Sequence, residues 1–129
     1  MTPLSENRGV RQRPEEGFRR WFVNDYFDVI VWYESARGDL TGFQLCYNRG
    51  IDERAFTWYR DKRSSHYVSS GGGDPRGATT RRMATAILQG DAGPVPEDVL
   101  QRLESERGDL DAELLDRIVL EARRYNQGS

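Results

Sequence analysis

The stretch TGFQLCYNRGIDERAFTWYR, residues 41–60, determines how we interpret the whole chain. It contains two segments rich in aromatic and aliphatic residues, separated by the short charged loop RGIDE at 49–53. Aromatic and β-branched residues favour strands, and a short polar connection between two strands favours an antiparallel hairpin. We therefore predict that residues 40–48 and 54–60 pair as neighbouring strands.

Further strand-like segments lie on both sides of this hairpin. RRWFVND (19–25) and YFDVIVWYE (26–34) precede it, and HYVSS (66–70) follows it. Short connections favour an antiparallel meander, because strands that follow one another in the chain then lie side by side. The sequence thus predicts a mainly antiparallel β-meander sheet.

The C-terminal region has the apolar spacing of amphipathic helices. Pro96 suits the first turn of a helix that continues to about Ser105, and Asp109 is placed to cap a second helix. The apolar stripe of that second helix extends from Leu110 to Ala122. We predict an α+β fold in which these helices pack on one face of the sheet. The segment RRMATAILQ at 81–89 fits either a short helix or a strand, and we leave both open.

The 129 residues are enough for one domain with a substantial core. Residues 1–18 have few apolar side chains, two prolines and two glycines, so we predict a disordered or loosely attached arm before a single domain at 19–129. Cys46 is the only cysteine, which excludes an internal disulfide. The ligands for a metal site are lacking, and we expect no cofactor. With no long apolar run, we expect no membrane partner and a cytoplasmic protein.

The register of the hairpins decides which side chains share a face, because a slip of one residue moves every side chain to the other face. We place the first turn around Arg37 and Gly38 and the third turn in DKRSS, residues 61–65. The expected opposite pairs are Trp32 with Phe43, Phe43 with Trp58, Trp58 with Val68, and Arg60 with His66. The core face under the helices is then expected to carry Ile30, Trp32, Phe43, Leu45, Phe56, Trp58 and Val68.

The other face is expected to be half apolar and half polar. It would carry Phe27, Val29, Val31, Tyr33, Gly42, Gln44, Cys46, Ala55, Thr57, Tyr59 and Tyr67. Such a face is too apolar to be simply hydrated and too polar for a dry core. We therefore expect a small binding domain that self-associates or binds a partner protein, with Tyr33, Gln44, Tyr59 and Tyr67 as the binding residues.

An alternative is a small enzyme that acts on an anionic substrate. The expected register puts Glu34, Thr41, Arg60 and His66 in one row, and His66, Arg60 and Glu34 together could perform acid–base chemistry. Ordinary pairs of side chains across a sheet explain the same row, and we favour that interpretation and a protein that is not an enzyme.

Two other groups of residues are weaker candidates for chemistry. Cys46 lies in the middle of a strand, which suits a packed residue better than a nucleophile. Asp52 and Glu53 are adjacent carboxylates in a loop, and we expect a hydrated turn in which Arg54 pairs with Asp28.

A third alternative is binding of single-stranded nucleic acid. Residues 49–82 combine aromatic side chains with eight basic residues, and exposed aromatic side chains on a sheet can stack on bases. The isoelectric point of about 5.5 argues against this function. The glycine-rich SSGGGDPRG at 69–77 lacks the lysine that ends a phosphate-binding loop, so it does not indicate a nucleotide site.

The residues at about 20–58 follow the pattern W-F…D-[LV]-x-V-W…G-F-Q-L-C-Y…E-R-A-[FL]-T-W. In this respect the chain resembles a group of small uncharacterised bacterial proteins, and the similarity continues more weakly through His66 and 81–93. No activity is attached to that group, so the resemblance implies no catalytic or binding residue. It implies a bacterial, cytoplasmic, self-contained domain.

Overall fold

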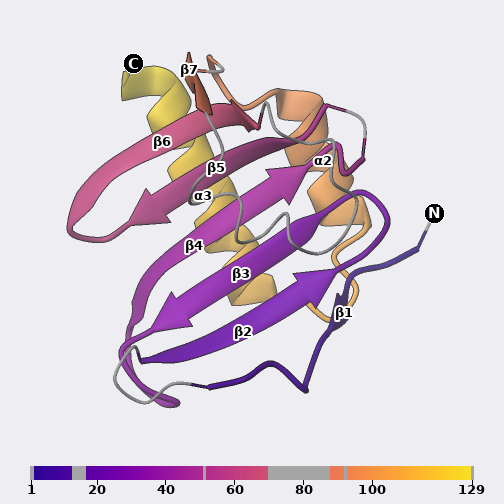
Figure 1. The fold of residues 1–129 in the computed structure, drawn as a ribbon, viewed down its shortest axis with the longest axis vertical. Helices are drawn as coiled ribbons and strands as arrows, with labels where there is room; N and C mark the ends of the chain where they lie inside the picture. The colour runs from indigo at the N-terminus through magenta and orange to yellow at the C-terminus, as the bar shows by residue number, and fades with distance from the viewer. Residues whose placement is uncertain (1, 13–16, 51, 70–87, 92, 129) are drawn as a thin grey trace.

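A computed structural model describes residues 2–12, 17–50, 52–69, 88–91 and 93–128. The described strands are β1 (Ser5–Glu6), β2 (Phe18–Val23), β3 (Asp28–Tyr33), β4 (Leu40–Tyr47), β5 (Arg54–Tyr59), β6 (Lys62–Ser69) and β7 (Leu88–Asp91). The described helices are α2 (Glu97–Ser105) and α3 (Ala112–Gly128). The strands form one sheet in chain order with antiparallel neighbours, and both helices lie behind it in Figure 1. The predicted α+β meander with C-terminal helices is confirmed.

The core lies between the sheet and the two helices. The helices contribute one buried stripe each, consisting of Val99, Leu100 and Leu103 from α2 and Leu114, Leu115, Ile118, Val119 and Ala122 from α3. The sheet contributes Phe22, Val29, Val31, Phe43, Leu45, Tyr47, Phe56 and Trp58. Each large apolar side chain contributes about 1.5–3 kcal/mol when it is removed from water, so this contact between layers is the main source of stability.

The central hairpin has the predicted register, and the hairpin before it does not. Phe43 pairs with Trp58 in β4 and β5, as predicted. In β3 and β4, however, Phe43 pairs with Val31 rather than with Trp32. The cause is a bulge, because Tyr33 pairs with Leu40 while Trp32 pairs with Gly42. The additional residue in β4 between these two pairs shifts the register by one.

This shift reverses the two faces of β3. Val29 and Val31 are fully buried under the helices, whereas Ile30 and Trp32 are partly exposed on the opposite side. Phe27, expected on the second face, is also in the core. The predicted assignment of Ile30 and Trp32 to the core face is therefore wrong. The predicted core residues of β4 and β5 do lie on the core face.

The third hairpin turns earlier than predicted. Tyr59 pairs with Lys62, so the turn consists of Arg60 and Asp61, and His66 lies opposite Phe56 instead of Arg60. The predicted pairs of Arg60 with His66 and of Trp58 with Val68 are wrong. The shift is by an even number of residues, which keeps His66 on the helix-covered face.

The N-terminal residues contact the domain through Leu4. This side chain is only 1% exposed and belongs to the core, and its neighbours in β1 pair with β2. The Leu4 N–H donates to the carbonyl of Glu106, and the Asp109 N–H donates to the carbonyl of Leu4. Leu4 and its neighbours, which belong to the arm that we expected to be loosely attached, are thus fixed between β2 and the connection from α2 to α3.

The sequence makes a prediction both for the segment 81–89, a short helix or a strand, and for the start of α3. Residues 88 and 89 of that segment belong to β7, and residues 81–87 lie outside the described part. α3 begins at Ala112, and the Asp109 carboxylate accepts a hydrogen bond from the N–H of Glu6. Asp109 therefore holds the N-terminal segment rather than capping α3 as predicted.

Candidate binding face

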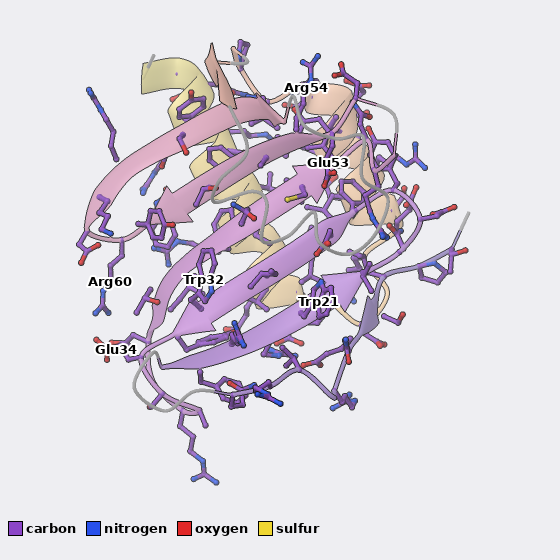
Figure 2. The ribbon with its side chains drawn as sticks, viewed as in Figure 1. Trp21, Trp32, Glu34, Glu53, Arg54 and Arg60 are labelled. Carbon is purple, nitrogen blue, oxygen red and sulfur yellow. The ribbon has the colours of Figure 1, made fainter. Side chains whose placement is uncertain are left out.

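The sheet has a second face, on the side away from α2 and α3. From the strand pairs, its described side chains form three rows, with Trp21, Ile30, Gln44 and Thr57 in the middle row. One flanking row has Arg19, Trp32, Gly42, Tyr59 and Lys62, and the other has Val23, Asp28, Cys46 and Ala55. We call this set the second face. Figure 2 shows Trp21 and Trp32 on it, in front of the sheet.

Trp32 and Tyr59 stack on one another across Gly42. Their ring centroids are 5.8 Å apart and the planes differ by 11°. A β-carbon at Gly42 would lie 3.2 Å from Trp32 Cε3 and 3.1 Å from Tyr59 Cδ1, so glycine leaves the space in which the rings meet. The Lys62 ammonium lies 5.1 Å from the Tyr59 ring centroid. Stacking fixes both rings, and a fixed ring loses little conformational entropy on binding.

Trp21 is anchored by a carboxylate. Its indole Nε1–H donates to Oδ1 of Asp28 at 2.5 Å. Burial raises the pKa of the Asp28 carboxyl above its ordinary value, and the indole hydrogen bond and nearby Arg49 oppose this effect. Glu53 also has a raised pKa, caused by burial and then by the neighbouring Asp28 carboxylate. Asp28 on the second face therefore orients an indole and lies near a second partly buried acid in the loop between β4 and β5.

The polar centre of the face is internally hydrogen-bonded. The Gln44 amide Nε2 donates to Thr57 Oγ1 at 3.0 Å, and the Cys46 thiol donates to Gln44 Oε1 at 3.6 Å. Cys46 is buried, and this burial raises the pKa of its thiol. A thiol that stays protonated is a poor nucleophile. The structure thus agrees with the interpretation of Cys46 as a packed residue.

The expected binding residues do not all lie on the second face. Gln44 and Tyr59 lie there and are partly exposed. Tyr33 is on the helix side, where it packs against the core and its ring lies 6.2 Å from that of Phe18. The backbone of Tyr67 pairs with Ala55, and its side chain lies outside the described part of the structure.

The residues of the enzyme hypothesis are separated. Glu34 and Arg60 form an ion pair between exposed side chains at one end of the sheet, visible at the lower left of Figure 2. His66 pairs with Phe56, whereas Arg60 lies in the turn after β5, four residues further along the chain, or about 13 Å at the rise of a strand. The placement of His66 next to Arg60 is therefore wrong.

His66 instead has a structural environment. Only 1% of its surface is exposed, and Nδ1 lies 2.7 Å from the carbonyl oxygen of Gly93. Because a carbonyl only accepts, Nδ1 carries a proton, and Nε2 is hydrogen-bonded to the Tyr47 hydroxyl at 2.6 Å. The imidazole thus connects β4 and β6 to the segment that leads into α2.

The loop between β4 and β5 also differs from the expectation. The Arg54 guanidinium contacts Oδ2 of Asp52 at 2.6 Å, and Asp28 is hydrogen-bonded to Trp21 instead. Figure 2 places Glu53 and Arg54 together at the end of the sheet opposite to Glu34 and Arg60. Among the described residues, no group of three or more histidine, cysteine, aspartate or glutamate side chains could hold a metal ion.

Four apolar members of the second face were not expected there. They are Trp21, Val23, Ile30 and Trp32, and the sequence shows only that they lie in strands. Val29, Val31 and Tyr33 are as apolar as Ile30 and Trp32, so β3 has no polar alternation that could indicate its exposed side.

Comparison of the chain with protein-family models, curated proteins and solved structures finds no match. The resemblance to small bacterial proteins therefore remains an expectation. Within the described ranges, neither helix is long and apolar enough to span a lipid bilayer.

Proposed function

We propose that the protein is a small binding domain whose second face contacts another protein. The observation that supports this proposal is the group of partly exposed, large side chains on that face, Trp21, Ile30, Trp32 and Tyr59. Aromatic side chains are the commonest energetic centres of protein interfaces. In the helix layer, the described residues include one exposed large apolar side chain, Leu120 of α3, and the partly exposed Tyr125.

The arrangement of these side chains suits an interface. Trp32 is held by Tyr59, and Trp21 is held by Asp28, so neither ring has to be ordered when a partner binds. The polar groups at the centre, Gln44 and Thr57, already satisfy one another. Covering them therefore leaves few unpaired polar atoms.

The proposed occupant is a second copy of the chain, and a different protein is the alternative. Size-exclusion chromatography with light scattering should give a mass above that of the 14.9 kDa monomer, and Tyr59→Arg should restore the monomer. Leu120→Arg is the matched control, because it changes the exposed apolar residue of the helix layer. A wild-type monomer that also captures no protein in a pull-down would contradict the proposal.

Binding of single-stranded nucleic acid is a second candidate. It is favoured by the row in which the Trp32–Tyr59 stack lies between Arg19 and Lys62, since aromatic rings stack on bases and cations contact phosphates. Fluorescence anisotropy of a labelled oligouridine should then rise at low salt and fall with added salt. No rise at low salt, or equal binding by Tyr59→Ala, would exclude this function.

We further propose a cytoplasmic location. The chain has one cysteine, and that thiol is buried and reduced, which suits a compartment in which disulfides do not form. Fractionation of cells that make the tagged protein would test this, and recovery outside the cytoplasm would contradict it.

A further inference from the structure

A pocket lies where the N-terminal segment passes the edge of the second face. It has a volume of about 330 Å³ and is lined by Asn7, Gly9, Val10, Arg11, Arg19, Trp21 and Ile30. That volume is at the lower end of the range for small-molecule sites. The pocket is separate from the Trp32–Tyr59 stack, because neither of those two residues lines it.

The N-terminal wall of the pocket is fixed at both ends. At one end the Asn7 N–H donates to the carbonyl of Trp21. At the other end the Gln12 side chain donates to the carbonyl of Arg19 and accepts from the N–H of Arg19. Between these points the Gly9 N–H donates to Oδ1 of Asn7, which turns the chain. The segment therefore arches beside β2 and encloses a hollow.

The floor of the pocket is apolar and contains an oriented ring. Trp21 and Ile30 are opposite one another in β2 and β3, and Val10 of the N-terminal wall also lines the pocket. The indole of Trp21 is fixed through its edge by the hydrogen bond to Asp28. Its face is then available for offset stacking with a planar ligand.

The pocket also has two cationic groups. Arg11 and Arg19 line it, and the Arg19 Nε–H donates to the carbonyl of Arg11. Within the described ranges, no carboxylate forms an ion pair with either guanidinium. A guanidinium binds carboxylate or phosphate oxygens in pairs.

From the apolar floor, the fixed indole and the two guanidinium groups, we propose that this pocket binds a small planar anion, an aromatic ring that carries a carboxylate or a phosphate. The ring packs on Trp21 and Ile30, and the anionic group pairs with Arg11 and Arg19. This site shares Trp21 and Ile30 with the proposed protein interface, but Trp32 and Tyr59 do not line it, so the Tyr59→Arg variant tests the interface separately from the pocket.

The test uses the indole N–H signals of the ¹⁵N-labelled full chain, with the Trp21 signal identified by its loss in Trp21→Phe. The probes are benzoate and phenyl phosphate, compared with benzyl alcohol, which has no charge, and inorganic phosphate, which has no ring. Saturable shifts of the Trp21 signal are expected with benzoate, phenyl phosphate or both, and the preferred probe identifies the anionic group.

Two variants test the guanidinium groups, and a third is the matched control. Arg11→Gln and Arg19→Gln should each weaken binding by roughly fivefold or more, since each removes a charge-assisted contact. Arg8→Gln lies on the same segment, does not line the pocket and should bind as the wild type does. The proposal is overturned if neither anionic probe binds, if benzyl alcohol binds equally well, or if both arginine variants keep wild-type affinity in a folded protein.

Discussion

Gly42→Ala tests whether the space across the sheet at Gly42 holds the Trp32–Tyr59 stack. The added β-carbon would lie 2.7 Å from the backbone oxygen of Trp58, closer than real β-carbons approach other atoms. It would also lie 3.1 Å from Tyr59 and 3.2 Å from Trp32. The rings can move aside, but the contact with the backbone oxygen requires a shift of β4 against β5.

Two opposing effects set the expected magnitude. Overpacking of this kind costs about 1–3 kcal/mol. Replacing glycine by alanine also restricts the unfolded chain, which stabilises the fold by about 0.4–1 kcal/mol where the backbone conformation is compatible. The steric effect is the larger, so Gly42→Ala should lower the free energy of unfolding by about 1–2 kcal/mol.

Urea denaturation followed by far-UV circular dichroism measures this change, and near-UV circular dichroism reports the environment of Trp32 and Tyr59. Gly9→Ala is the matched control, because its β-carbon would meet only the Asn7 side chain at 3.5 Å. A Gly42→Ala variant that is as stable as the wild type, with an unchanged near-UV spectrum, would refute the reasoning.

Other substitutions and one labelling experiment test further parts of the structure. Leu4→Ala should lower the free energy of unfolding by about 2–4 kcal/mol in urea denaturation, because it leaves a cavity in the core, whereas the exposed Ser5→Ala should have little effect. Equal effects of the two would contradict the attachment of the N-terminal segment. Burial raises the pKa of Asp28, so its carboxyl adds to stability while protonated, below about pH 4, and this contribution is lost as the pH rises. Asp28→Asn, which can still accept the Trp21 hydrogen bond, should therefore gain stability relative to the wild type as the pH rises above about 4, and a difference independent of pH would count against a buried acid. The Cys46 thiol should react with Ellman's reagent far more slowly in the native protein than in urea, since it is buried and its pKa is raised. Rapid reaction of the native protein would show that the thiol is accessible.

The order of the strands and the fold class could be predicted because they depend on local signals. Turn residues separate the segments, and the apolar stripe of α3 has helical spacing. The register between β4 and β5 was also predictable, because polar residues alternate with large apolar ones in both strands. Gln44 separates Phe43 from Leu45, and Thr57 separates Phe56 from Trp58. In such strands a slip by one residue puts the large apolar side chains of the two strands on opposite faces, and the loop length limits larger slips.

The exposed face of β3 could not be predicted in the same way. All six residues from Val29 to Glu34 except the last are apolar or aromatic, so a shift by one residue exchanges one apolar set for another. The bulge opposite Tyr33 made that shift, and it moved Trp32 to the second face and Tyr33 to the helix side. Of the residues in the candidate site, the sequence therefore predicted Gln44 and Tyr59, whereas only the structure places Trp21 and Trp32 there.

The burial of Leu4 has a consequence for how the chain folds during synthesis. The hairpins from β2 to β6 connect residues that are close in sequence, so they can form as soon as they leave the ribosome. Leu4 is bonded to Glu106 and Asp109, which are made about a hundred residues later. The N-terminal segment beside β2 therefore lacks these two hydrogen bonds until the connection between the helices has been translated. A chaperone that shields strand edges could bind this edge of the nascent sheet for longer than the others.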